Sequence, residues 1–212
     1  IIGYSNKLSY DFKIKPLRDT GNCPISPPVV NFRVNDGARN DRQKTNLKEA
    51  ETIVALMMAC IEQKEYQGMT FGAITLLGDE QAQIIQQIIL QRIDPIVIEQ
   101  RGILCGNASH FQGDERHVVF LSLVDNNEGE GYLTMAGEGA DQSRKQRYNV
   151  AASRAKDQLW VVHSLDYTRD LKAGDLRRDL LEYTENPKAF TVLAENVEAA
   201  AESPFEEAVA KS

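Results

Sequence analysis

Apolar stretches of strand length alternate along the chain with stretches whose apolar residues fall at helical spacing. The strand-like runs predict strands at residues 29–34, 71–77, 103–109, 117–124 and 158–165. The helical spacing and its end signals predict helices at residues 46–64, 78–90, 148–156 and 175–185. Near-continuous apolar strands covered by helices are typical of a parallel sheet buried on both faces. The pattern therefore predicts an α/β fold with a mostly parallel central sheet.

Two of the predicted helices carry detailed signals. Asn46 followed by Glu49 is a capping-box-like start. In the helix that follows, to about Lys64, the apolar residues at helical spacing are Leu47, Ala50, Val54, Met57, Met58 and Ile61. The helix over 78–90 should bury Ala82, Ile85, Ile88 and Ile89, and it should end before Asp94-Pro95.

Three stretches lack periodicity. Residues 1–28 contain four prolines and are predicted to be irregular. Residues 125–147 are rich in glycine and predict a long flexible loop. Residues 186–203 are rich in Ala and Glu and predict a helical linker or a frayed tail. Ligands of doubly wound sheets bind outside the carboxyl ends of the strands, so functional residues are expected directly after the strands.

The net charge of −7 over 212 residues argues against a free-standing nucleic-acid-binding protein. The charge is uneven, however. Residues 125–141 have five acidic groups and no basic one, whereas residues 144–156 have five basic groups and no acidic one. The basic run is either a solvated surface or a local anion site, because a small positive cleft is compatible with an acidic chain.

The remaining composition narrows the class of protein. The longest apolar runs are about nine residues, far short of a bilayer span of about 20. The odd count of three cysteines, without a C-x-x-C pair, favours a reducing cytoplasm over a disulfide scaffold or a zinc module. The chain begins at Ile1, without a signal-peptide pattern, and we interpret it as a fragment of a longer protein.

Several common chemistries are missing from the sequence. It contains no G-x-x-x-x-G-K-[ST] phosphate loop and no G-x-S-x-G elbow. The three histidines lack metal-ligand spacing, so no metal site is predicted. His163 lies in an apolar strand and is expected to be a packed or hydrogen-bonded core residue. Cys60 and Cys105 are expected to be inert core thiols.

Residues 108–123, ASHFQGDERHVVFLSL, combine a polar turn with two flanking apolar strands. Such a turn makes backbone amides and carboxylates available to a ligand. Glu115 could accept hydrogen bonds from a sugar hydroxyl, and Ser109 and His110 could donate to phosphate. The alternative is a charged connection that binds nothing.

Residues 147–162, RYNVAASRAKDQLWVV, place Arg154 and Lys156 on a helix of small residues just before a buried strand. Close packing of that helix would fix the backbone at Arg154, which suits an arginine that neutralises a transferring phosphoryl group. The alternative is an arginine at a helix C-terminus that interacts with the helix dipole and with Asp157.

Together these segments resemble motifs V and VI of superfamily 1 helicases. HFQGDERHVVFLSLV carries the Gln-Gly-x-Glu core of motif V, and YNVAASRAK resembles the Asn-Val-Ala-x-[Ser/Thr]-Arg-Ala of motif VI. FGAITLLGDEQ resembles the preceding strand-turn-helix, with Leu77-Gly78 in place of the usual Pro-Tyr and with Gln81 at the position of the family's Gln. IIGYSNKLSYDFKIKPL resembles the segment after motif IV.

The resemblance implies that residues 1–185 form the second RecA-like domain, a three-layer α/β fold, of an ATP-dependent helicase or translocase. ATP and Mg²⁺ would be bound mainly by an absent first RecA-like domain, so the fragment alone is expected to be inactive. Arg154 would be the arginine finger. The nucleotide would also contact Gln112, Gly113, Glu115 and Lys156, and single-stranded DNA or RNA would contact Ser109, His110, Gln81 and Asn149.

The tail over residues 186–212 ends in ESPFEEAVAKS, which resembles the first helix of endonuclease domains of the very-short-patch-repair type. This resemblance implies a nuclease-like domain further along the chain and a role in DNA repair. The alternative is an exposed acidic helix. Two other functions stay open for the whole chain: a catalytically silent scaffold that binds a partner protein, and a module that positions the nuclease.

Overall fold

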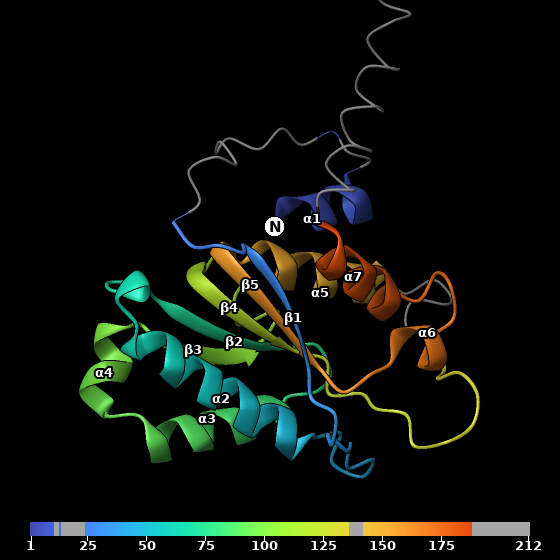
Figure 1. Ribbon diagram of the computed structural model, residues 1–212, viewed down its shortest axis with the longest axis horizontal. Coiled ribbons are helices and arrows are strands. Elements are labelled where there is room, and N and C mark those ends of the chain that lie inside the picture. Colours follow the sequence, from blue (N-terminus) through green and yellow to red (C-terminus); the bar gives the residue numbers. More distant parts are fainter. Residues whose placement is uncertain (11–12, 14–23, 136–141, 188–212) are drawn as a thin grey trace, which may run out of the picture.

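The computed structural model describes residues 1–10, 13, 24–135 and 142–187 (Figure 1). Its centre is a five-stranded sheet in which every neighbouring pair is parallel, in the order β1-β5-β4-β2-β3. The strands are β1 Val29–Arg33, β2 Phe71–Thr75, β3 Leu104–Asn107, β4 Arg116–Ser122 and β5 Ala155–His163. The predicted parallel α/β fold is confirmed, and the arrangement is RecA-like.

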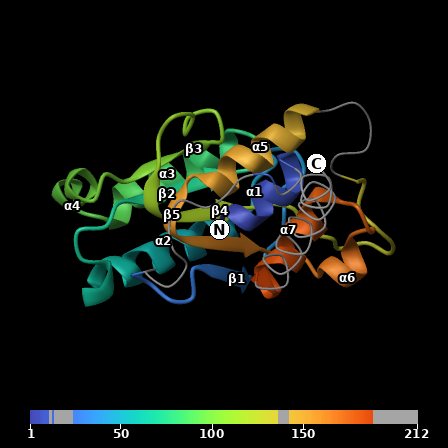
Figure 2. The same cartoon turned by 90° about the horizontal axis from the view of Figure 1, so that it is seen from above.

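Helices cover both faces of the sheet, which gives three layers (Figures 1 and 2). On one face lie α1 Ile2–Ser9, α5 Gln142–Ser153 and α7 Leu176–Glu185. On the other lie α2 Leu47–Glu62, α3 Glu80–Arg92 and the short α4 Pro95–Gln100. A 3₁₀ turn, Lys64–Tyr66, follows α2, and α6 Tyr167–Asp170 follows β5.

Strand β4 is apolar almost without interruption, and its two faces explain why. Val119 and Leu121 point into the core beneath α1, α5 and α7, whereas Val118 and Phe120 point into the core above α2 and α3. All four side chains have no exposed surface. Because both faces of the strand are buried, neither face needs polar residues.

The predicted start of α2 at Asn46 is confirmed, whereas Asp79 precedes α3 without a side-chain cap bond. The Asn46 side chain accepts a hydrogen bond from the Glu49 backbone N–H and caps α2. The four apolar residues predicted to face inward from α3 are all buried. Leu47, at the first turn of α2, is 54% exposed, because the face of the helix that turns inward there carries Glu49 and Ala50, which are both fully buried.

Three helices were not predicted: α1, α4 and the short α6. Residues 2–9, expected to be irregular, form α1, whose Ser5 hydroxyl lies 3.4 Å from the Asn149 carbonyl oxygen of α5. Tyr4 of α1 is buried against Tyr183 of α7, with ring centroids 5.7 Å apart. Helix α4 begins at Pro95, where the sequence suggested only the end of α3, because Asp94 caps it and proline suits the first helical position.

The helix predicted at 148–156 is shifted. It begins at Gln142 and ends at Ser153, and residues 155 and 156 already belong to β5. Ala155 pairs with Arg116 of β4, so inter-strand hydrogen bonding ends the helix earlier than its small residues suggested. Arg154 therefore lies at the junction between α5 and β5.

The acidic stretch after β4 is less loose than predicted as far as it is described. Leu133 donates its backbone N–H to the Asp170 carbonyl at 2.8 Å, and the Arg177 guanidinium bonds the Thr134 carbonyl at 2.7 Å. Residues 136–141 lie outside the described part of the chain. So does most of the predicted tail, because the description ends at residue 187.

Candidate functional site

The segment between β3 and β4, residues 108–115, crosses one face of the sheet without forming a helix. We call it the crossing segment. It leaves β3 at Asn107, which pairs with Thr75 near the end of β2, and it enters β4 at Arg116, where that strand begins. It therefore runs from the end of the sheet where strands finish, the carboxyl end, to the end where they start, the amino end. Turns are closed by three backbone bonds: His110 N–H to Asn107, Gln112 N–H to Ser109 and Asp114 N–H to Phe111.

Helix α5 crosses the same face in the same direction. Near its start, the Arg147 guanidinium donates to the Leu76 carbonyl just beyond β2, at 3.3 Å. Past its end, the Arg154 carbonyl accepts the Arg116 backbone N–H at 3.0 Å. The basic run over residues 144–156 is thereby divided between the two ends of the sheet, instead of forming one anion site.

At the amino end of the sheet, the two predicted motifs meet. Pairing of β4 with β5 places Glu115 and Lys156 side by side, with their Oε2 and Nζ atoms 3.7 Å apart and both side chains well exposed. Gly113, two residues before Glu115, has a φ of +85°, and no atom beyond its chain neighbours lies within 4 Å of where its Cβ would be. A side chain would be strained at that φ, so the glycine is required by the turn and leaves open space beside Glu115.

Arg154 is folded back on the end of α5. Its Nε lies 3.3 Å from the Val150 carbonyl oxygen and 3.3 Å from the Ser153 hydroxyl, and its Nη2 donates to that hydroxyl at 2.9 Å. These contacts match the helix-dipole part of the alternative, in which a cation satisfies the last carbonyls, but not its pairing with Asp157. They are also few and neutral, so the guanidinium can exchange them for an anion at little cost.

The residues predicted to contact nucleic acid lie in different parts of the structure. Ser109 and His110 are exposed at the carboxyl end of the sheet, where the Ser109 hydroxyl donates to Asn107 Oδ1 at 2.6 Å and His110 Nδ1 accepts the Asn107 N–H at 3.2 Å. Asn107 in turn donates to Asp79 at 2.6 Å. Arg147 is anchored at this end as well, so an anion passing there would meet one cation fixed by a backbone contact.

Gln81 and Asn149 lie elsewhere. Gln81 is fully buried; its side chain bonds both the N–H and the carbonyl of Asn46, and also the Ser122 hydroxyl. It joins α3 to the start of α2 and to β4. Asn149 lies where α5 packs on α1, with Nδ2 3.4 Å from the Tyr10 hydroxyl, and its buried Oδ1 has no hydrogen-bond partner. Contact of either residue with nucleic acid stays a prediction.

This geometry corrects the expected location of the residues that were predicted to contact the nucleotide. Gln112, Gly113, Glu115, Arg154 and Lys156 gather at or near the amino end of the sheet, whereas the rule for doubly wound sheets pointed to the carboxyl end. The rule describes a ligand bound by one sheet alone. These residues precede strands β4 and β5, so they face outward from the opposite end.

The carboxyl end holds a buried polar cluster that the sequence did not reveal. Glu49 is fully buried and accepts hydrogen bonds from the Val124 N–H and the Ser122 hydroxyl, both at 2.8 Å, and from the Ser164 hydroxyl, also at 2.8 Å. Val124 has a φ of +69°, which is strained for a β-branched residue. The capping-box spacing identified Glu49 as a helix-start residue, but not as the group that joins the ends of β4 and β5.

Burial raises the pKa of Glu49 to about 7, although its hydrogen bonds oppose the shift. In the unfolded chain the carboxyl ionises near its ordinary pKa of 4.5. Between these two values the unfolded state binds fewer protons than the folded state, so stability falls as the pH rises. We expect the unfolding free energy of the wild type to drop by up to about 3 kcal/mol over this window relative to Glu49→Gln, which cannot ionise.

Urea unfolding of both proteins between pH 4 and pH 8 measures this difference. All other titrating groups are shared by the two proteins, so their contributions cancel. A difference between wild type and Glu49→Gln that stays constant with pH would contradict the expectation.

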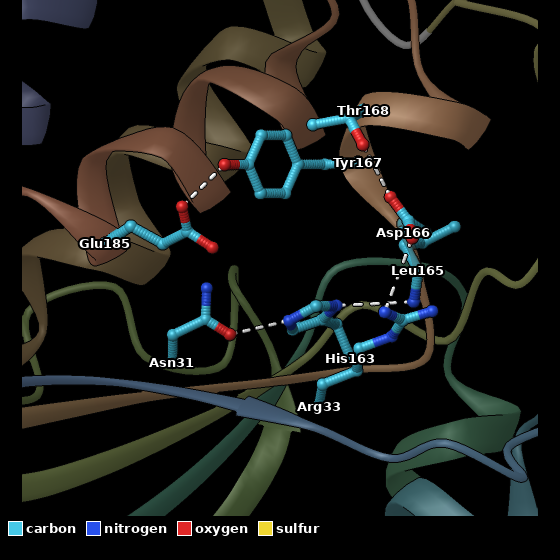
Figure 3. Close-up of a pocket in the computed structure, with 8 residues that line it drawn as sticks. All are labelled: Asn31, Arg33, His163, Leu165, Asp166, Tyr167, Thr168 and Glu185. Atoms are coloured by element: carbon cyan, nitrogen blue, oxygen red, sulfur yellow. Dashed lines mark hydrogen bonds and ion pairs between the residues drawn. The ribbon is translucent and has the colours of Figure 1, made fainter.

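A cavity of about 300 Å³ lies where β1 and β5 end, against α6 and α7 (Figure 3). His163 is buried there with Nε2 2.7 Å from Asn31 Oδ1, which confirms it as a hydrogen-bonded core residue. Burial, aided by Arg33, lowers its pKa to about 4. The Tyr167 hydroxyl donates to Glu185 at 2.5 Å. None of the predicted site residues lines this cavity.

Two of the three cysteines lie in the part of the chain that the structure describes. Cys60 is buried and Cys105 is partly buried; both are free thiols, and burial raises the pKa of Cys105 to about 12. Cys23 lies outside the described residues.

Within the described ranges, no group of three or more His, Cys, Asp or Glu side chains could hold a metal ion. No helix described in the structure has both the length and the apolar character needed to cross a bilayer.

Comparison with known proteins finds one family and two relatives of interest. A protein-family model described as an AAA domain matches residues 4–166. A protein of Mycoplasma pneumoniae, named as the homologue of an uncharacterized ATP-dependent helicase, is 28% identical over 128 residues, which cover 56% of this chain and 11% of the relative. An uncharacterized ATP-dependent helicase of Mycoplasma genitalium is 24% identical over 169 residues, covering 75% of this chain and 14% of the relative. The chain thus spans a small fraction of both relatives.

Proposed function

Because this chain belongs to the AAA domain family, we propose that it is the second RecA-like domain of a longer ATP-dependent helicase or translocase. The proposal is supported by the names of the two Mycoplasma relatives and by their much greater length. A first RecA-like domain would supply the phosphate loop that the printed sequence lacks, together with the ligands for Mg²⁺.

The observation that carries the proposal is the meeting of Glu115, Lys156 and Arg154 at the amino end of the sheet. A carboxylate suited to sugar hydroxyls, an open turn at Gly113 and an arginine on a fixed backbone are the groups that half of a nucleotide site needs. ATP would bind between this end and the first domain. Arg154 would leave the end of α5 and stabilise charge on the γ-phosphate in the transition state.

Single-stranded nucleic acid would run past the carboxyl end of the sheet, near Ser109, His110 and Arg147. Contacts with phosphates and stacked bases would give grip without sequence preference. Closing and reopening of the cleft around ATP would change the contacts with the single strand. The crossing segment and α5 would transmit the change, because both reach from one end of the sheet to the other.

The test is ATP hydrolysis by the full-length protein, alone and with single-stranded DNA, single-stranded RNA or duplex DNA. We expect slow hydrolysis alone and a rate about tenfold or more higher with a single strand, equivalent to a barrier lower by about 1.4 kcal/mol. Absence of hydrolysis in all four conditions would contradict the proposal and favour a scaffold. Equal rates with and without nucleic acid would contradict the translocase function, although the protein would still be an ATPase.

A further inference from the structure

Phe111 is the anchor of the crossing segment. Every residue between Ala108 and Arg116 is exposed except Phe111, whose side chain has no exposed surface. Its ring belongs to the apolar cluster that also contains Ala151 and Ala152 of α5. Phe111 thus holds a largely solvated segment of chain in the core on the α5 side of the sheet, and the exposed His110 also lies against Gly106 of β3.

The sheet makes room for this ring at Gly72 in β2. A Cβ atom at Gly72 would lie 2.8 Å from Phe111 Cε1 and 3.2 Å from its Cζ, and 3.2 Å from Cγ of Arg116. Real Cβ atoms essentially never approach another atom as closely as 2.8 Å. Gly72 has an ordinary strand conformation, so its role is close approach of the ring rather than backbone freedom.

Phe111 lies between the residues proposed to contact nucleic acid and those proposed to contact the nucleotide. Ser109 and His110 precede it and lie at the carboxyl end of the sheet. Gln112, Gly113 and Glu115 follow it and lead to the amino end. Three backbone bonds within the segment, together with bonds from Asn107 Oδ1 to the Ser109 and His110 N–H groups, hold its turns together as units, so a shift of the ring would move both groups.

We propose that Phe111 is a positioning residue that sets the place of both the nucleotide-contacting and the nucleic-acid-contacting parts of the segment, with Gly72 providing the seat for its ring. This inference rests on the proposed function. It assigns no contact of Phe111 with either ligand. Small displacements of positioned groups are costly in enzymes, since about 1 Å can reduce the rate by about a hundredfold.

The first test compares Phe111→Leu with Phe120→Leu in the full-length protein. Phe120 is equally buried but lies on the α2–α3 face, so it controls for general loss of core packing. Both variants are expected to unfold at lower temperature. At a temperature where both remain folded, Phe111→Leu should raise the KM for ATP and the half-stimulating concentration of a single strand by about fivefold to a hundredfold. Phe120→Leu should change both by less than about twofold, as expected for loss of packing remote from the segment.

The second test uses the contact with Gly72. Gly72→Ala should raise both constants when Phe111 is present, because the new Cβ displaces the ring. In the Phe111→Leu background the same change should have little further effect, since leucine lacks the far ring atoms that the Cβ would meet. Only the softer contact with the flexible Arg116 side chain would remain. Gly129→Ala, where the nearest atom is 3.7 Å from the added Cβ, is the matched control.

The outcomes separate this inference from the proposed function. If the wild type hydrolyses ATP under stimulation but Phe111→Leu behaves like Phe120→Leu, Phe111 is a core residue and the inference alone fails. Additive effects of Gly72→Ala and Phe111→Leu would also overturn it. Absence of stimulated hydrolysis in the wild type would remove the proposed function, and the inference with it.

Discussion

Replacing Arg154 by alanine is expected to lower the rate of ATP hydrolysis by the full-length protein by about 10³- to 10⁵-fold, the range measured for arginine fingers in other phosphoryl-transfer enzymes. The contribution is large because a guanidinium held close to the γ-phosphate stabilises charge that develops only in the transition state. Binding of ATP in the ground state should change far less, so the affinity for a fluorescent ATP analogue measured alongside kcat should be close to that of the wild type.

The structure supplies controls for this prediction. Arg154→Lys keeps the positive charge but loses the planar fork that matches phosphate oxygens, so it should recover only part of the rate. Arg178→Ala removes an arginine on α7, remote from the amino end of the sheet, that pairs with Glu182, and should leave hydrolysis unchanged. An Arg154→Ala variant with a normal rate would leave the arginine in its observed role at the end of α5, bonded to Val150 and Ser153.

Replacing Arg177 by alanine is expected to lower the unfolding free energy of the chain by about 3–5 kcal/mol, the usual cost of removing one partner from a buried ion pair. The Arg177 side chain is only 7% exposed and bonds two carboxylates, Asp125 at 2.6 Å and Asp175 at 2.7 Å. Asp175 is fully buried and also caps α7. Without the guanidinium, both carboxylates would remain buried with less compensation.

Urea unfolding followed by circular dichroism measures this loss. Arg178→Ala is again the comparison: it removes a partly exposed pair with Glu182 and a bond to the Leu171 carbonyl, so it should lower the unfolding free energy by much less than Arg177→Ala. A change below about 1 kcal/mol for Arg177→Ala would mean that the carboxylates are satisfied by water or by protonation. Since Arg177 also bonds the Thr134 carbonyl, its loss should expose the segment after β4 to faster hydrogen exchange.

Prediction from the sequence was most accurate where one local pattern decides the element. The five strands were located within a few residues, apart from the start of β5, because each is a short apolar run bounded by polar or glycine-containing turns. The four apolar residues of the buried face of α3 were predicted, but the buried Gln81 beside them was not. The errors occur where tertiary contacts decide. Helix α1 depends on its packing against α5 and α7, and the boundary between α5 and β5 depends on the pairing of Ala155 with Arg116.

For the candidate site, the sequence proposed individual residues but gave no arrangement. The spacing of motifs identified Glu115, Arg154 and Lys156, yet it gave no sign that they meet at the amino end of the sheet or that the basic run divides between the two ends of α5. Both facts depend on the direction in which α5 and the crossing segment traverse the sheet, which a linear pattern does not contain.

The sequence by itself determined the fold class, the strand positions and the residue types available for nucleotide chemistry, because these follow from hydrophobic periodicity and from short motifs. Only the tertiary structure decided which residues share an end of the sheet, that Glu49 and Gln81 are buried links between elements, and that Phe111 lies on Gly72. Those contacts join residues 35 or more positions apart in the chain, so their formation depends on the packing of the complete core.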